Sequence, residues 1–185
     1  MALQHDPQLL KYLALERGPS ATMMRLATIL NRFSFYRFTF VAAFITFFVS
    51  ILVGWFYRYF VDGFNIFSFP LFFIIPSHPI QKFYLAVFFH PLFETIIDQW
   101  LLINLLQKGK IPEKWIIIIN TVLFSLGHLS NSFLSAINTL FTGLVLNFSY
   151  FYWLNRCQSK KLAFESSLSI HALHNFYHYI LMFIR

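Results

Sequence analysis

Charged residues and cysteines are both scarce in this 185-residue chain. Asp, Glu, Lys and Arg make up 11% of it, whereas 58% is hydrophobic. A soluble domain of this length could not cover so much apolar surface, which excludes that class of protein. The only cysteine is Cys157, so no disulfide can form within the chain. Cys157 lies in a short polar loop without a nearby His or acid, and we expect no catalytic role for it.

The excess of basic residues does not indicate a nucleic-acid-binding protein. The formal net charge is +7, but Lys and Arg occur singly and in pairs beside apolar runs. No long basic cluster or base-stacking motif accompanies them, so we predict no nucleic-acid partner. These residues are instead typical of anchors at the membrane edge. The first 37 residues also lack the continuous apolar core of a cleavable signal peptide.

Several runs of about 20 apolar residues predict an all-α fold, a polytopic membrane helical bundle. We expect one bundle over residues 38–185. Its five transmembrane helices are predicted at about Phe38 to Phe60, Gln81 to Leu106, Trp115 to His128, Phe133 to Leu154 and Leu162 to Ile184. Residues 61–79 contain three prolines and an apolar core too short to cross, which favours an interfacial or re-entrant loop.

Residues 1–37 are expected to form a cytosolic or interfacial segment. After Gly18-Pro19, apolar residues alternate with Arg25 and Arg32 in a pattern that favours a basic helix lying at the membrane surface. A disordered tail is the alternative for this segment.

The positions of the basic residues predict an orientation in the membrane. The N-terminal segment and the loops at 108–114 and 155–161 hold 11 of the 14 Lys and Arg residues. Because cytosolic loops are enriched in these residues, the alternation predicts five spans with the N-terminus in the cytosol. We expect an integral, lipid-surrounded protein of a bacterial inner (plasma) membrane. No feature of the sequence indicates a particular oligomeric state.

Two carboxylates, Glu94 and Asp98, interrupt the second expected span. An ionisable group within the hydrocarbon is costly unless it faces a cavity or a partner, so it marks a functional site by default. His90, Glu94 and Asp98 follow one another at four-residue intervals and share a helix face. Pro91 is expected to kink or restart the helix just before Glu94.

Polar side chains from three spans are expected at one depth in the membrane. At the α-helical rise, Glu94 lies about 20 Å from the cytosolic loop and His128 about 21 Å along the next helix. His171 and Asn175 lie about 14 and 20 Å along the last span. A Glu and a His that face one water can activate it, while His and Asn can donate to an oxyanion. This set suffices for peptide-bond hydrolysis without a Ser or Cys nucleophile.

These residues resemble the CPBP family of intramembrane proteases, which comprises type II CAAX prenyl proteases and bacteriocin-processing (Abi) enzymes. The family has three short motifs, Glu-Glu-x-x-x-Arg, Phe-x-x-x-His and His-x-x-x-Asn. In this chain they read Glu94-Thr95-Ile-Ile-Asp98-Gln99, Phe124-Ser-Leu-Gly-His128 and His171-Ala-Leu-His174-Asn175. The first motif matches in part and the other two in full. The resemblance covers about residues 80–180.

The resemblance implies an intramembrane endopeptidase that acts on a peptide or membrane-protein substrate. It implies that Glu94 and His128 activate water, and that His171 and Asn175 form the oxyanion site. The residues expected to support these four are Thr95, Asp98, Gln99, Phe124 and His174. It also implies a mechanism without a metal or other cofactor. A Glu with two His would suit zinc as well, which is the alternative.

Thr95 and Gln99 stand where the family motif has Glu and Arg. They could hydrogen-bond as a neutral pair that replaces the charged one. They could equally mark a catalytically silent relative that serves as a membrane scaffold or regulator. A di-iron or haem oxidoreductase that uses the His residues is a third possibility, but it needs more paired ligands than the chain offers.

Overall fold

The computed structural model describes residues 34–57, 59 and 78–181. The predicted N-terminal surface helix and almost all of the predicted loop at 61–79 lie outside the described residues. The chain divides into two units, Met1–Phe38 and Thr39–Arg185. The structure described below is that of the second unit, which holds all the predicted site residues.

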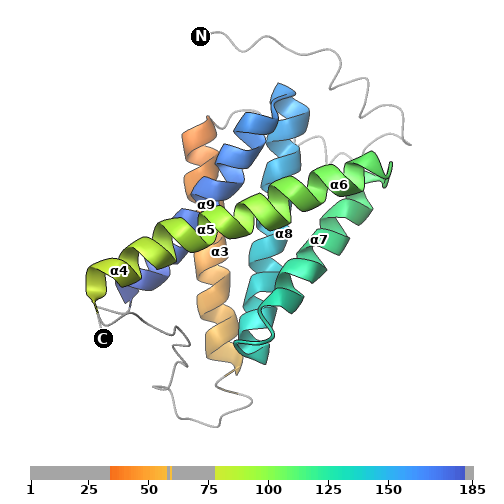
Figure 1. Cartoon of the computed structure of the whole chain (residues 1–185). Helices are drawn as coiled ribbons and strands as arrows, with labels where there is room; N and C mark the ends of the chain where they lie inside the picture. The colour runs from red at the N-terminus through yellow and green to blue at the C-terminus, as the bar shows by residue number, and fades with distance from the viewer. Residues whose placement is uncertain (1–33, 58, 60–77, 182–185) are drawn as a thin grey trace, which may run out of the picture. The chain divides into compact units, whose positions relative to one another are not determined.

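The all-α fold class is confirmed, and no strand occurs among the residues that the structure describes. Figure 1 shows α3 (Phe35–Tyr57), a long helix (Pro79–Lys108), α7 (Glu113–Gly127), α8 (Phe133–Cys157) and α9 (Lys160–Leu181). These are the five predicted helices. α3, the long helix and α8 are long and apolar enough to cross a membrane, so the chain is an integral membrane protein. That α7 and α9 also cross stays a prediction.

Two tight turns fold α7, α8 and α9 against one another. Ser132 caps the N-terminus of α8, because its hydroxyl accepts the Ser135 N–H at 3.0 Å. At the other end Gln158 adopts a left-handed conformation with φ 50°, which ends α8. α9 begins two residues later at Lys160. As a result α7 packs on α8 and α8 packs on α9.

α3 has a buried face made of small side chains. Its buried residues from Thr39 onward are Thr39, Ala42, Ala43, Thr46, Ser50 and Gly54. Large apolar side chains, including Phe40, Phe44, Phe48 and Trp55, are exposed on the same helix. Small residues at the helix contact and large apolar ones outside are typical of packing within lipid.

The long helix continues through Pro91 as one helix and does not restart there. It is composed of α4 (Pro79–Tyr84), a π-helical turn η2 (Leu85–Phe89), α5 (His90–Glu94), a second π-helical stretch η3 (Thr95–Leu101) and α6 (Leu102–Lys108). In η2 the N–H of His90 bonds to the carbonyl of Leu85, five residues back. Widened turns of this kind accommodate a proline inside a helix, since the neighbouring groups can re-satisfy freed carbonyls.

The carbonyl freed by Pro91 is taken up by α9. In the π register the donor for the Ala86 carbonyl would be residue 91, and proline has no N–H. The side-chain amide of Asn175 donates to this carbonyl instead, at 2.9 Å. This bond fixes α9 beside η2 and thereby sets the position of α9 relative to Glu94, two turns further along the long helix.

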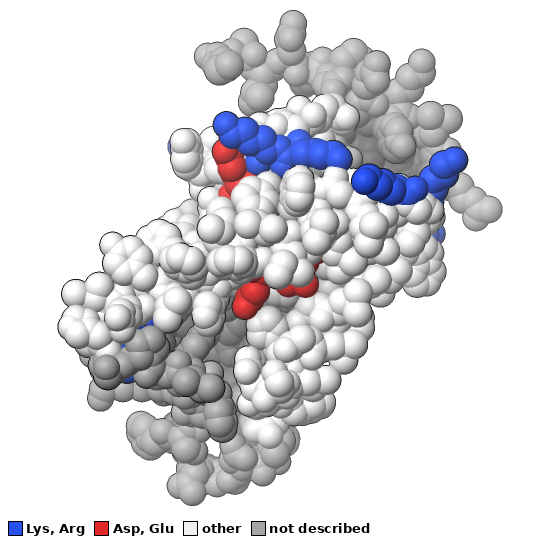
Figure 2. Space-filling view, viewed as in Figure 1, with Lys and Arg blue, Asp and Glu red and all other residues white. Residues whose placement is uncertain are grey.

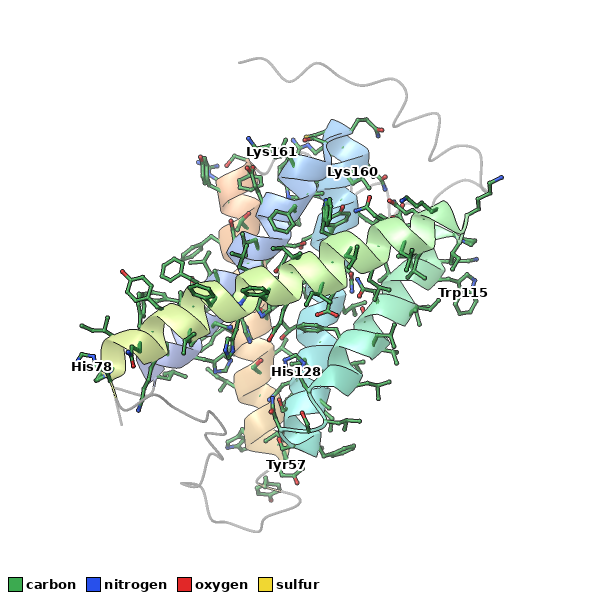
Figure 3. The ribbon with its side chains drawn as sticks, viewed as in Figure 1. Tyr57, His78, Trp115, His128, Lys160 and Lys161 are labelled. Atoms are coloured by element: carbon green, nitrogen blue, oxygen red, sulfur yellow. The ribbon has the colours of Figure 1, made fainter. Side chains whose placement is uncertain are left out.

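Basic side chains gather at one end of the described bundle. Figure 2 shows a line of Lys and Arg there, while the middle of the same face is uncharged except for acidic atoms. In Figure 3, Lys160 and Lys161 lie toward this end, and His128 and Tyr57 lie toward the opposite end. The basic end is the one that the charge pattern predicts to be cytosolic; the orientation itself stays a prediction.

Candidate active site

The structure brings Glu94 together with two imidazoles from other helices. Glu94 Oε2 lies 3.3 Å from His171 Nε2, and Glu94 Oε1 lies 3.9 Å from His128 Nε2. The carboxylate ends α5, His171 lies in α9 and His128 follows the last residue of α7. The Glu94 side chain is 30% exposed, whereas that of His171 is 5% exposed. The carboxylate is therefore both held from within and accessible from outside.

The turn after α7 determines which nitrogen of His128 faces Glu94. Its Nδ1 lies 2.9 Å from the carbonyl oxygen of Phe124. A carbonyl can only accept, so in the neutral ring Nδ1 carries the hydrogen and Nε2 presents its lone pair to Glu94. Two acceptors 3.9 Å apart are too distant for a direct hydrogen bond. They leave a position where one water can donate a hydrogen to each.

His171 holds the other carboxylate oxygen. Its Nδ1 is buried and has no hydrogen-bond partner among the described residues. Orphaned buried N–H groups are rare, and an unpaired acceptor is better tolerated. The hydrogen of the neutral ring is therefore assigned to Nε2, which points at Glu94 Oε2 across 3.3 Å. His171 thus orients the carboxylate in this arrangement.

Phe124 packs against both imidazoles. Its ring centroid lies 4.9 Å from that of His128 and 5.9 Å from that of His171. Behind it is Gly143 of α8, where an added Cβ would lie 2.9 Å from Phe124 Cδ1. In the sequence, Gly143 is one of several small residues of the fourth span, which by themselves indicate only close helix packing. Its contact with Phe124 makes it part of the wall that positions the two His side chains.

Replacing Gly143 by Ala is expected to lower kcat for the peptide cleavage that the motifs predict by about 10- to 100-fold, because a shift of about 1 Å in a reacting group can have an effect of this size. The new methyl group would displace Phe124, and with it the rings of His128 and His171. The matched control is Gly127→Ala, since an added Cβ there meets nothing within 4 Å. Steady-state kinetics on both variants checks this, and equal rates for the two would contradict it.

Asn175 and His174, which follow His171 on α9, bind other helices. Asn175 Nδ2 donates to Ala86 as described, and this uses one of its two amide hydrogens. His174 Nδ1 lies 3.0 Å from Thr46 Oγ1 of α3. The Thr46 hydroxyl donates its single hydrogen to the Ala43 carbonyl, so His174 is the donor in this pair. His174 therefore joins α9 to α3.

The remaining predicted residues surround the first motif. Thr95 and Gln99 are fully buried, and their side-chain polar atoms have no hydrogen-bond partner among the described residues. They therefore do not bond to each other. Asp98 is half-buried, one helical turn beyond Glu94, and His90 is exposed. The His178 ring packs on His174, with the centroids 4.6 Å apart.

The His and acidic side chains do not form an evident metal site. Within the described ranges no three His, Cys, Asp or Glu residues are grouped so that they could hold a metal ion. The metal-independent mechanism stays a prediction, as does the zinc alternative.

Comparison with known proteins identifies a family. The chain matches no curated protein and no solved structure. The family described as type II CAAX prenyl endopeptidase Rce1-like matches residues 76–177, which is more than half of the 185 residues. The match includes the long helix and all four predicted catalytic residues. The protein therefore belongs to the Rce1-like type II CAAX prenyl endopeptidases, and through them to the CPBP group of intramembrane proteases.

Proposed function

We propose that this protein hydrolyses a peptide bond in a membrane-associated substrate, with Glu94 as the general base. The observation that supports this most directly is the Glu94 carboxylate placed between His171 at 3.3 Å and His128 at 3.9 Å. No structural role requires an acid and two imidazoles to converge inside an apolar helix bundle, where an ionisable group is costly.

The proposed reaction begins with a water held by Glu94 Oε1 and His128 Nε2, each of which accepts one of its hydrogens. Glu94 removes a proton as the water oxygen bonds to the scissile carbonyl carbon. The proton then passes to the departing nitrogen as the carbon–nitrogen bond breaks. The products are a carboxyl group and an amine, and Glu94 returns to its starting state. No metal takes part in this scheme.

The negative charge that develops on the carbonyl oxygen needs donors in this scheme. We assign them to the Asn175 amide hydrogen that does not bind Ala86 and to His171 Nε2–H, which passes from Glu94 Oε2 to the carbonyl oxygen once Glu94 has taken the proton of the water. Fixed donors of this kind typically contribute about 10²- to 10³-fold to the rate. The bond from Asn175 to Ala86 supports the assignment, because it holds the amide in place before substrate binds.

The substrate proposed is a peptide that carries a prenyl group near its cleavage site, as the family description suggests. The outer face of the long helix is apolar, with Phe88, Phe89 and Phe93 exposed in the two turns that precede Glu94. A lipid-attached peptide would approach such a site laterally, through the membrane. Orientation with the N-terminus in the cytosol and residence in a bacterial inner membrane are part of the same proposal.

The test uses the purified full chain in lipid bilayers with a farnesylated CAAX peptide, and the same peptide without the lipid as the control. We expect new amine groups to appear with time from the farnesylated peptide, faster than from its control and unaffected by a chelator. Equal cleavage of both peptides would contradict the prenyl specificity. Absence of cleavage of either would contradict the protease assignment.

A catalytically silent scaffold is the second candidate. The observation that favours it is the replacement of the motif's Glu and Arg by Thr95 and Gln99, which are buried and lack partners among the described residues. If the protein is silent, alleles with Glu94→Ala or His171→Ala will retain the cellular phenotype while truncations abolish it. If it is a protease, both point variants will behave as the truncations do.

A further inference from the structure

The buried side of η3 is polar. Its only buried residues are Thr95 and Gln99, and η3 packs against α7, α8 and α9. Three side-chain atoms, Thr95 Oγ1, Gln99 Nε2 and Gln99 Oε1, are therefore enclosed there without a hydrogen-bond partner among the described residues. Burial of an unpaired polar atom is unfavourable, so a set of such atoms in one interface requires an explanation.

The helices that face η3 contribute polar atoms of the same kind. Asn120 of α7 donates one of its two amide hydrogens to Asn147 Oδ1 of α8, at 2.7 Å, and Asn147 Nδ2 in turn donates to Thr121 Oγ1 at 3.0 Å. Asn120 Oδ1 is left without a partner in the described part of the chain, and so is Ser166 Oγ of α9. All these residues are buried. Polar side chains are thus buried on each of α7, α8 and α9, the three helices that pack against η3.

The chemistry of these atoms defines what they can bind. Gln99 Nε2 can only donate, Asn120 Oδ1 and Gln99 Oε1 can only accept, and the two hydroxyl groups can do both. None of these side chains is charged, which disfavours a metal ion or an anion. Water both donates and accepts, and buried water typically makes about three hydrogen bonds to groups that would otherwise be unpaired.

We propose that Thr95, Gln99, Asn120 and Ser166 line a water-holding compartment between η3 and the α7–α9 layer, and that this compartment supplies water to Glu94. The supply role rests on the proposed function. Thr95 directly follows Glu94 in the chain, so their Cα atoms are about 3.8 Å apart, and in this proposal the compartment ends at that point. An internal source of water leaves the lipid-facing side of Glu94 to the substrate.

The opposite end of this compartment points toward the basic end of the bundle. Asn104 of α6 is five residues beyond Gln99, next to the fully buried Ile103, which continues the four-residue spacing of Thr95 and Gln99. Asn104 Oδ1 accepts a hydrogen bond from Lys160 Nζ, and Lys160 is exposed. Asn104 therefore places a polar side chain between Gln99 and the exposed basic end of the bundle.

The first test replaces the lining groups by apolar ones of similar size, in the double variant Thr95→Val/Gln99→Leu. We expect kcat to fall at least 10-fold with KM within about twofold, because substrate binding is untouched while water is withheld. The hydroxyl-retaining variant Thr95→Ser is expected to keep at least half of the wild-type kcat. A double variant with wild-type kcat would overturn the supply role. If the double variant does not fold, Thr95→Val alone carries the same comparison.

The second test detects the water without any substrate. Hydroxyl-radical labelling modifies side chains that adjoin internal water, and Tyr150 is fully buried near Asn104. We expect Tyr150 to be labelled in the wild type and in Glu94→Gln, and to lose labelling in the double variant. Buried Phe151 is the internal control. An unlabelled Tyr150 in the wild type would overturn the compartment, whereas labelling in a protein that cleaves no peptide would contradict only the proposed function.

Discussion

Glu94→Gln is expected to reduce the rate of peptide cleavage by about 10²- to 10⁴-fold, the range typical for loss of a general base. Gln has the shape of Glu and can still accept a hydrogen bond from His171 Nε2, which lies 3.3 Å from the carboxylate. It cannot take a proton from water. Because the substitution also removes a charge from the bundle, the variant should be at least as stable as the wild type. Cleavage kinetics and a thermal unfolding scan on the same preparation measure both effects.

The matched control for this variant is Glu165→Gln. Glu165 is an acid on α9 that forms a 3.8 Å pair with Lys161 at the exposed end of the helix, six residues before His171. Exposed pairs of this kind contribute little, so we expect wild-type cleavage. Retention of more than a tenth of the activity by Glu94→Gln would rule out the base role. A loss of activity in both variants would indicate a general effect of removing an acid.

The helices could be predicted from the sequence because the length of an apolar run is a local property. The expected span at Phe133 to Leu154 became α8, which extends three residues further, to Cys157. The behaviour of Pro91 could not be predicted in the same way. Whether a proline breaks a helix depends on whether another group pairs with the freed carbonyl. Here that carbonyl belongs to Ala86, and its partner Asn175 is 89 residues further along the chain.

The sequence predicted at what depth in the membrane the site residues lie, but not which of their side chains contact one another. Counting residues along the helices placed Glu94, His128 and His171 at comparable heights, and the structure brings their polar atoms within 3.9 Å. Counting residues could not predict which side chains form hydrogen bonds with one another, because these contacts depend on how each helix is rotated about its axis. The pairing of His174 with Thr46 is one such case, since a threonine on an apolar helix carries no signal of its own.

His128→Asn is expected to reduce cleavage by about 10²- to 10⁴-fold while leaving the fold intact. The Asn amide can replace Nδ1 in donating to the Phe124 carbonyl, a bond of 2.9 Å in this structure. It has no atom in place of Nε2, which faces Glu94 at 3.9 Å. The variant therefore separates the roles of the two ring nitrogens: Nδ1, which bonds to Phe124 at the end of α7, and Nε2, which would hold the water. Cleavage kinetics with a thermal unfolding scan distinguishes them.

His128→Ala completes the comparison, because it removes both nitrogens. It should lose as much activity as His128→Asn and in addition about 0.5–1.5 kcal/mol of stability, the usual contribution of one hydrogen bond. His78→Asn is the control, since His78 is exposed and its side chain makes no capping bond to the long helix. If His128→Asn cleaves peptide at the wild-type rate, then Nε2 takes no part in holding water and Glu94 must act without it. If the Asn variant unfolds as readily as the Ala variant, the Asn amide does not reproduce the bond to Phe124, and His128→Gln decides instead. Gln puts a polar atom near the position of Nε2. Restored cleavage in His128→Gln would show that a polar group facing Glu94 at that position is what the reaction requires.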